Sequence, residues 1–226
     1  DHTDYASTCK PLAATGLVVA SIGQRVGEGF PYPLQIQDIH YGVRWLKAHA
    51  AEFNGDPNAL GGIGYSSGGH TLPLVAMRID DPRYSALHLE GSSPADARLA
   101  WIISCWPVIE PYFRYEIAKG KGNTELMEKH HMFFQGDEAM HESTPLNVIK
   151  RGEKLTLSPA LVLHGTADDV MPIEASERFV SAYNEAGGKV ELVPFQGMGH
   201  GWAREAGLEV DELVEIVTEF ITKQLD

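Results

Sequence analysis

Residues 61–70 read GGIGYSSGGH, and Ser66 is flanked by Gly64 and Gly68, each two positions away. This spacing is typical of a nucleophile elbow, a tight turn between a strand and a helix that holds a strained serine with its hydroxyl clear of the sheet. We expect glycine at positions 64 and 68 to let the strand and the helix pass without collision between side chains. An apolar segment precedes the serine, and residues 71–77 form an apolar run that suits a buried helix. The stretch therefore predicts a strand, a turn at Ser66 and a helix.

The alternation of strands and helices extends along the chain in both directions from this turn. Continuous apolar runs with β-branched residues predict buried parallel strands, and apolar residues at helical spacing predict helices. We expect helices over 5–14, 34–51, 174–186 and from 208 onward, and strands over 17–22, 99–104, 160–163 and 190–195. Such alternation with right-handed crossovers favours an α/β fold, with a mostly parallel sheet and helices on both faces.

Between residues 106 and 158 this alternation stops, and the stretch is rich in aromatic and charged residues with no clear strand. Long structureless loops are uncommon in compact domains, so we predict a helical cap insertion over 106–158 within a single α/β domain of residues 1–226. The aromatic side chains suit a small core of the cap itself. Trp106 and the more distant Trp202 are candidates for the wall of a substrate pocket.

The composition disfavours several classes of partner. A formal net charge of −13, from 18 basic and 31 acidic residues, would repel the phosphates of nucleic acids and anionic membranes. No run of about 18 apolar residues occurs, so no membrane span is expected. The chain begins at Asp1 without methionine or a signal peptide, and its true start is expected upstream or processed away. These observations fit a soluble protein with a small-molecule substrate; they leave a homo-oligomer and the compartment open, with the cytoplasm slightly favoured.

Neither a disulfide framework nor a metal or nucleotide site is expected. Cys9 and Cys105 are too few for a framework and lack metal-ligand spacing, so we expect two buried free thiols. His130 and His131 lack the i, i+4 spacing of zinc ligands on a helix. Residues 61–69 match neither glycine fingerprint of nucleotide-binding loops. The sequence therefore predicts no cofactor.

A serine hydroxyl is a poor nucleophile at neutral pH, so Ser66 needs a histidine to take its proton and a carboxylate to orient that histidine. Residues 164–172 follow a predicted strand and offer Asp168, and the glycine-rich residues 197–202 after the next strand offer His200. The chain order Ser66, Asp168, His200 is that of α/β-hydrolases. Agreement in residue type, order and position at strand ends predicts a catalytic triad.

Each part of the triad has an alternative. Ser67 could be the nucleophile, but it is off-centre between the glycines. Asp169 could replace Asp168 as the orienting acid, although the second carboxylate of such a pair is usually solvated or caps a turn. His164 could act beside Asp168, but a histidine at a strand end before glycine is more often packed and hydrogen-bonded.

These features give the chain a resemblance to α/β-hydrolase-fold serine esterases, close to the bacterial esterase and lipase group that includes acetyl esterases, carbohydrate esterases and kynurenine-formamidase-like amidases. The resemblance covers nearly all of the 226 residues. Besides the serine turn, it is carried by residues 42–46 (GVRWL), 54–57 (NGDP), 143–146 (STPL) and 164–168 (HGTAD). It implies the α/β-hydrolase fold, with the family aspartate at Asp168 and the family histidine at His200.

One feature of this group is missing. Its members usually carry a His-Gly-Gly loop before the first helix, whose backbone amide supplies half of the oxyanion hole, and the sequence has none upstream of Tyr5. Residues 1–8 resemble the segment shortly after that loop. Either part of the oxyanion hole is lost or an N-terminal portion with the first strands is missing; we favour the second, because the sheet would otherwise expose an apolar edge. The backbone amide of Ser67 supplies the remaining donor.

The triad and the resemblance together predict a hydrolase of small carboxylic esters that works through an acyl-enzyme. Two alternatives stay open. One is a formamidase-like amidase. The other is a catalytically weak binding protein on a hydrolase fold, since loss of one oxyanion donor costs about 10² to 10³ in rate.

Overall fold

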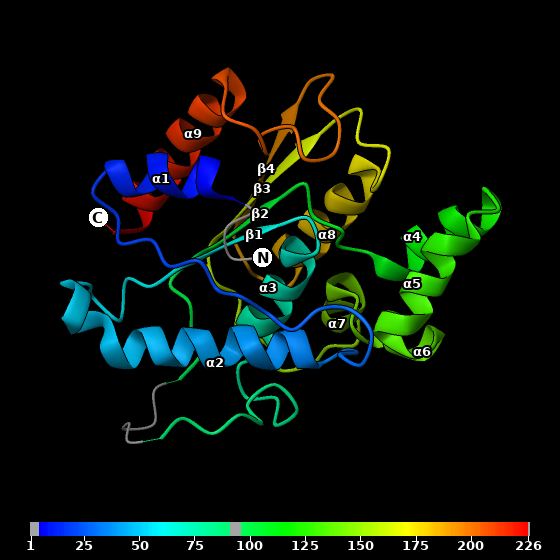
Figure 1. Ribbon diagram of the computed structural model, residues 1–226, viewed down its shortest axis with the longest axis horizontal. Coiled ribbons are helices and arrows are strands. Elements are labelled where there is room, and N and C mark those ends of the chain that lie inside the picture. The colour runs from blue at the N-terminus through cyan, green and yellow to red at the C-terminus, as the bar shows by residue number, and fades with distance from the viewer. Residues whose placement is uncertain (1–4, 91–95, 226) are drawn as a thin grey trace.

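Four parallel strands form the sheet at the centre of the molecule, which a computed structural model describes for residues 5–90 and 96–225 (Figure 1). In chain order they are β1 (Gly62–Tyr65), β2 (Ile102–Cys105), β3 (Ala160–Gly165) and β4 (Val190–Phe195), and they lie side by side in that same order. The register aligns Tyr65 with Cys105, and Cys105 with Leu163. The predicted parallel sheet is confirmed, and the loops that follow the four strands all leave from one edge of it.

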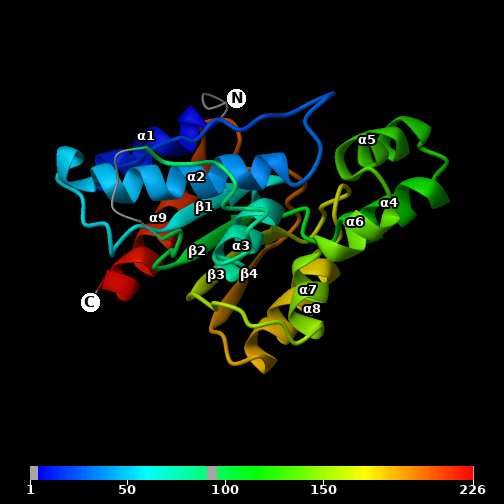
Figure 2. The same ribbon diagram turned by 90° about the horizontal axis from the view of Figure 1, so that it is seen from below.

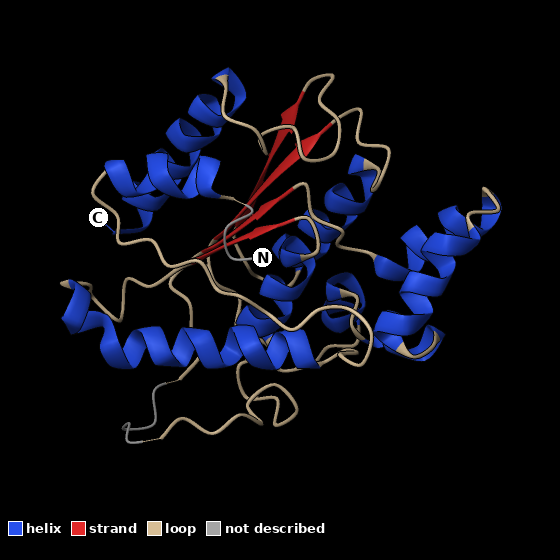
Figure 3. Cartoon of the chain, in the orientation of Figure 1, coloured by secondary structure: helices blue, strands red, loops and turns tan. Residues whose placement is uncertain are grey.

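Helices flank this sheet on both sides (Figure 3). They are α1 (Ala6–Ala14), α2 (Leu34–His49), the 3₁₀ helix η1 (Ala50–Phe53), α3 (Gly68–Met77), α4 (Pro111–Gly120), α5 (Thr124–Phe134), α6 (Asp137–Glu142), α7 (Pro145–Lys150), α8 (Ile173–Glu185) and α9 (Leu208–Leu225). The bounds agree closely with the predicted helices. In the part of the chain that the structure describes, no helix has the length and apolar character that a membrane crossing needs.

The strands divide their side chains between two hydrophobic cores, because successive residues of a strand point to opposite faces of the sheet. Ile102 and Val162 belong to one core, which α2, α3, α7 and α8 cover. Ile103 and Leu161 belong to the other, which α1 and α9 cover (Figures 1 and 2). Both faces of the sheet are therefore covered, which is why the central strands read as continuous apolar runs.

The prediction of a buried strand over residues 17–22 is wrong. The segment is an irregular loop in which Val18 is 60% exposed and Ile22 is 37% exposed. A strand requires a neighbouring strand to satisfy its backbone groups, and within the described residues β1 pairs only with β2. The loop lines a cavity instead. Cys9 lines the same cavity and is only half-buried, against expectation, whereas Cys105 is buried; both thiols are free.

Residues 106–158, all of which the structure describes, contain the helices α4 to α7 and no strand. The first three of these helices project to one side of the sheet (Figures 1 and 2). They enclose a small core of their own around Tyr115, Phe134 and Met140. The aromatic residues of this segment therefore pack mainly on one another, as the sequence predicted.

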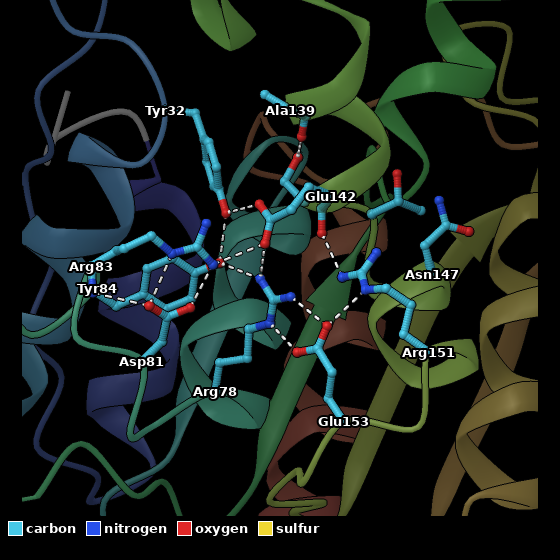
Figure 4. A network of polar contacts seen from close by, with 12 residues as sticks. Tyr32, Arg78, Asp81, Arg83, Tyr84, Ala139, Glu142, Asn147, Arg151 and Glu153 are labelled. Carbon is cyan, nitrogen blue, oxygen red and sulfur yellow. Dashed lines mark hydrogen bonds and ion pairs between the residues drawn. The ribbon is translucent and has the colours of Figure 1, made fainter.

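A network of ion pairs and hydrogen bonds joins these helices to the rest of the molecule (Figure 4). Glu142 at the end of α6 pairs with Arg78, which directly follows α3 and whose side chain is 7% exposed. Its other oxygen accepts a 2.6 Å hydrogen bond from the Tyr32 hydroxyl. The same arginine also donates two hydrogen bonds, of 2.9 and 2.8 Å, to Glu153 beyond α7. These contacts hold together the segment that follows α3, the end of α6 and the segment that follows α7.

Candidate active site

Ser66 lies in the turn between β1 and α3, with a backbone φ of +52°. A non-glycine residue rarely adopts this left-handed conformation, which persists only where surrounding contacts impose it. Those contacts are present: the Ser66 amide donates to Cys105 O at 3.0 Å, and the Ser66 carbonyl accepts from the amides of Gly69 and Val108, both at 3.0 Å. The predicted elbow is thus anchored to the segment that continues from β2.

Two of the glycines around Ser66 are required by close backbone approach. A Cβ atom at Gly64 would lie 2.3 Å from Gly68 O, and one at Gly69 would lie 2.6 Å from Pro107 Cβ. By contrast, a Cβ atom at Gly68 would meet nothing within 4 Å. The expectation that glycine is needed at position 68 is therefore wrong. The carbonyl oxygen of Gly68 lies close to Gly64, but the space that a Cβ atom of Gly68 would occupy is empty. A side chain is therefore excluded at positions 64 and 69 and not at position 68.

Three loops at the same edge of the sheet bring Ser66, Asp168 and His200 into a hydrogen-bonded line. Ser66 Oγ lies 2.8 Å from His200 Nε2, although the two residues are 134 positions apart in sequence. His200 Nδ1 lies 2.8 Å from Asp168 Oδ2. Because the carboxylate can only accept, Nδ1 carries a proton, and in the neutral ring Nε2 is left to accept from the serine hydroxyl.

The carboxylate of Asp168 is buried and fully hydrogen-bonded. Its Oδ1 accepts from the amides of Val170 and Met171, both at 2.9 Å. Its Oδ2 lies near His200 Nδ1 and, at 3.2 Å, near His164 Nε2. Burial alone would raise the pKa of Asp168, but the hydrogen bonds from the two histidines and the amide of Met171 outweigh it and hold the pKa well below its usual range. The group is therefore an anion at neutral pH.

The structure distinguishes the sequence alternatives by their surroundings. Asp169 is exposed, and among the described residues its carboxylate makes no hydrogen bond to His200. Ser67 is also exposed at the start of α3, and its amide donates no hydrogen bond within the described part of the chain. His164 is packed and hydrogen-bonded, as expected, at 2.7 Å from Ser176 Oγ. It also lies beside Asp168, the possibility that the sequence left open, with Nε2 at 3.2 Å from Asp168 Oδ2.

A largely apolar cavity of about 800 Å³ reaches the site. Its lining includes Ser66, His200 and Trp106. The buried Trp106 ring has its centroid 5.3 Å from that of Trp202 in an edge-to-face arrangement, and Trp202 stacks on Phe195 at 4.0 Å. Trp106 therefore forms part of the cavity wall, and Trp202 supports it from behind.

His130 and His131 of the predicted cap have different surroundings. His130 is buried against Phe134, and His131 lies 3.9 Å from Asp137 near the surface. Across residues 5–90 and 96–225, no three His, Cys, Asp or Glu side chains are grouped so that they could hold a metal ion. Residues 1–4, part of the stretch 1–8 considered above, lie outside the described residues.

Comparisons with known proteins identify the family to which the chain belongs. A family model, BD-FAE, matches residues 1–183. Esterase LipC of Mycobacterium tuberculosis is 28% identical over 222 residues, covering 94% of this chain and 52% of LipC. Isoprenylcysteine alpha-carbonyl methylesterase ICME of Arabidopsis thaliana is 25% identical, covering 84% of this chain and 44% of that protein. The chain thus spans about half the length of these curated relatives, or less.

Solved structures resemble the chain over most of its length. Native esterase Est2 of Thermogutta terrifontis superposes with a TM-score of 0.75 at 25% identity, covering 98% of this chain and 76% of Est2. The structure of Thermogutta terrifontis esterase 2 phosphoramylated by tabun has the same TM-score at 26% identity, with 98% and 77% covered. An acetyl ester-xyloside bifunctional hydrolase from Caldicellulosiruptor lactoaceticus, at 21% identity and a TM-score of 0.73, shares the fold over 95% of this chain and 74% of its own.

Proposed function

Because the chain belongs to the BD-FAE family and has the α/β-hydrolase fold, we propose that it is a serine hydrolase that cleaves carboxylic esters through an acyl-enzyme. The observation that carries the proposal is the line of hydrogen bonds from Ser66 through His200 to Asp168, each 2.8 Å long. The names of the relatives support the same reaction, since LipC and ICME are both esterases.

The proposed reaction follows from the protonation states of the site. Ser66 Oγ attacks the ester carbonyl while His200 Nε2 takes the hydroxyl proton. Asp168 stabilises the imidazolium that forms and keeps the proton on Nδ1. His200 then returns the Nε2 proton to the departing alkoxide, which leaves an acyl-serine. A water molecule repeats the attack in the second half-reaction, with His200 again as the base.

Negative charge develops on the carbonyl oxygen in the transition state, so a donor must face it. We assign this role to the amide of Ser67, which follows the nucleophile and has no acceptor within the described residues. Its position at the start of α3 adds the positive end of the helix dipole. The backbone amide of Ser67 has this role and its hydroxyl has none, so replacement of the Ser67 side chain tests the assignment.

The substrate pocket is assigned to the cavity beside Ser66. We regard residues 106–158, with the helices α4 to α7, as a cap insertion in a single hydrolase domain. Trp106 supplies a flat apolar wall there. Trp202 fixes that wall by its edge contact. An apolar wall of this kind suits the hydrocarbon part of a small ester.

The decisive experiment compares Ser66→Ala with Ser67→Ala, using p-nitrophenyl acetate as substrate and a fluorophosphonate as covalent label. We expect Ser66→Ala to lose several orders of magnitude in kcat/KM, on the order of the 10⁶ seen when a serine nucleophile is removed, and to lose labelling. Ser67→Ala keeps its backbone amide and should retain both the kcat/KM and the labelling of the wild type. Near-wild-type turnover by Ser66→Ala, or labelling of Ser67, would refute the proposal. Parallel assays with a formyl amide separate an esterase from an amidase.

A further inference from the structure

The proposed nucleophile and its base follow strands that do not pair with each other. Ser66 follows β1 and His200 follows β4, and these two strands are the edges of the four-stranded sheet, with β2 and β3 between them (Figure 1). Within the described residues, no backbone hydrogen bond joins residues 64–69 to residues 196–204. The 2.8 Å contact between Ser66 Oγ and His200 Nε2 therefore depends on how two separate loops are held.

The loops of Asp168 and His200, by contrast, are joined directly. The strands before them, β3 and β4, are paired. Beyond the strands, the amide of Ala167 donates to Met198 O at 3.0 Å. These bonds fix His200 relative to Asp168, and they leave its distance from Ser66 to be set by other contacts.

The ring of Trp106 connects the two loops. Trp106 directly follows β2 and is 1% exposed. The centroid of its ring lies 5.5 Å from that of Tyr65, which directly precedes Ser66. It lies 5.3 Å from that of Trp202, which follows His200 by two positions. The ring of Trp106 is therefore the common neighbour of one ring beside the nucleophile and one ring beside the base.

The backbone of Trp106 has a conformation that a non-glycine residue rarely adopts. Its φ is +37°, and its amide donates to Leu163 O of β3 at 2.7 Å. Such a conformation persists only where the surrounding structure imposes it. The segment that follows is bonded to the nucleophile, because the amide of Val108 donates to Ser66 O at 3.0 Å. Trp106 is thus held from β3 on one side and from the serine turn on the other.

The two neighbours of this ring are themselves anchored. Tyr65 stacks on Tyr5 with a centroid distance of 4.1 Å, and its hydroxyl donates to Thr8 Oγ1 at 2.9 Å. Trp202 stacks on Phe195 at the end of β4 with a centroid distance of 4.0 Å. Closely packed rings have few alternative positions, so a change at one of them displaces the next.

We propose that Trp106 and Trp202 are positioning residues, whose contact sets the distance between the serine hydroxyl and the imidazole of His200. The two rings meet edge to face at an interplanar angle of 71°, a favourable arrangement for an aromatic pair. Proton transfer requires the hydroxyl and the imidazole to be within hydrogen-bond reach, and a misplacement of about 1 Å can cost on the order of 10² in rate. The inference rests on the proposed esterase function and gives the pocket wall a role in the chemical step.

Trp202→Leu tests the inference, because it removes the ring contact and leaves Trp106 in the cavity wall. With p-nitrophenyl acetate, we expect kcat and kcat/KM to fall together by about tenfold to a hundredfold, since the contact acts on proton transfer and not on substrate binding. The rate of labelling by a fluorophosphonate should fall by a similar factor. Trp202→Phe keeps an aromatic ring and should recover part of both rates.

A double-mutant cycle tests whether the effect passes through Trp106. Tyr65→Leu frees the same ring from its other side and should also lower kcat. Because either change alone releases Trp106, the two leucine substitutions together should cost less than the product of their separate factors. Factors that multiply would mean that the two rings act independently, and would overturn the inference. If Trp202→Leu does not fold, wild-type kcat in both Trp202→Phe and Tyr65→Leu would overturn it.

Phe179→Leu provides the control, because Phe179 is a buried ring of α8 that packs on Tyr183 in the other hydrophobic core. It should lower the midpoint of thermal unfolding and leave kcat unchanged. An equal fall of kcat in this control would overturn the inference. So would a rise in KM at constant kcat in Trp202→Leu, which would mean that Trp202 only supports the pocket wall. If the wild type does not hydrolyse p-nitrophenyl acetate, the esterase proposal itself fails.

Discussion

His164 Nε2 lies 3.2 Å from Asp168 Oδ2 in a fully buried pair. The same nitrogen lies 2.9 Å from the carbonyl oxygen of Met171, so it must carry the proton and donate. His164 Nδ1 is then free to accept from the hydroxyl of Ser176 at 2.7 Å. His164 therefore holds the carboxylate in place, and the carboxylate in turn orients His200.

This arrangement predicts that His164 acts as a positioning residue. His164→Leu removes a donor from Asp168 and leaves buried polar groups unpaired, which should lower the free energy of unfolding by about 1–3 kcal/mol and reduce kcat with KM nearly unchanged. His164→Gln keeps an amide donor and an acceptor, and should restore part of the stability and part of kcat. Urea unfolding and steady-state kinetics measure the two effects. A leucine variant with wild-type stability and kcat would contradict the prediction.

Asp168 and Asp169 should differ sharply when each is changed to asparagine. In Asp168→Asn the amide cannot stabilise the imidazolium and favours the wrong tautomer of His200, so we expect kcat to fall about 10³- to 10⁴-fold. Asp169 is exposed and outside the hydrogen-bonded line, so Asp169→Asn should stay close to the wild-type rate. Hydrolysis of p-nitrophenyl acetate measures both. The reverse order of effects would assign the orienting role to Asp169.

The steric demands of the serine turn predict different outcomes at two neighbouring glycines. An alanine Cβ at Gly64 would lie 2.3 Å from Gly68 O, so β1 and α3 would have to separate. Gly64→Ala should therefore lose about 1–3 kcal/mol or more of stability, together with most activity. Gly68→Ala meets no atom within 4 Å and adds a helix-favouring residue in the first turn of α3, so it should be neutral or stabilising. Thermal unfolding of the two variants gives the comparison.

Glu142 should make the fold sensitive to acid. Burial alone would raise the pKa of its carboxyl, but hydrogen bonds from Arg83, Tyr32 and Arg78 lower it to about 2. A group whose pKa is depressed in the folded state stabilises the fold above its unfolded pKa, about 4.3 for glutamate. That contribution is lost as the pH falls toward 2, and the depressed pKa of Asp168 adds to the loss.

Glu142→Gln isolates this contribution. The variant should be less stable than the wild type at pH 7, and its free energy of unfolding should depend less on pH between 5 and 2.5. Glu125→Gln is the control, because Glu125 lies on the neighbouring helix α5 in an exposed pair with Lys129, and such pairs contribute little. Urea titrations at several pH values test the prediction. If the free energy of unfolding of Glu142→Gln falls between pH 5 and 2.5 as much as that of the wild type, the network of Figure 4 is not the source of the acid sensitivity.

The sequence by itself determined those parts of the molecule that depend on local pattern. Apolar runs defined the four strands, helical spacing defined the helices around them, and two flanking glycines marked the turn at Ser66. Residue type and order then identified Asp168 and His200 as candidates. The four strands, the helices and the turn could be predicted because periodicity and turn chemistry are properties of neighbouring residues.

The tertiary structure decided what depends on partners far away in the chain. Residues 17–22 have the composition of a strand but no strand to pair with, because hydrogen bonding between strands is not local. The sites where glycine is required and the contact of His164 with Asp168 likewise depend on which segments pack together. The sequence pattern identifies residues whose side chains could take part in catalysis, and only the tertiary packing determines which of them come into contact.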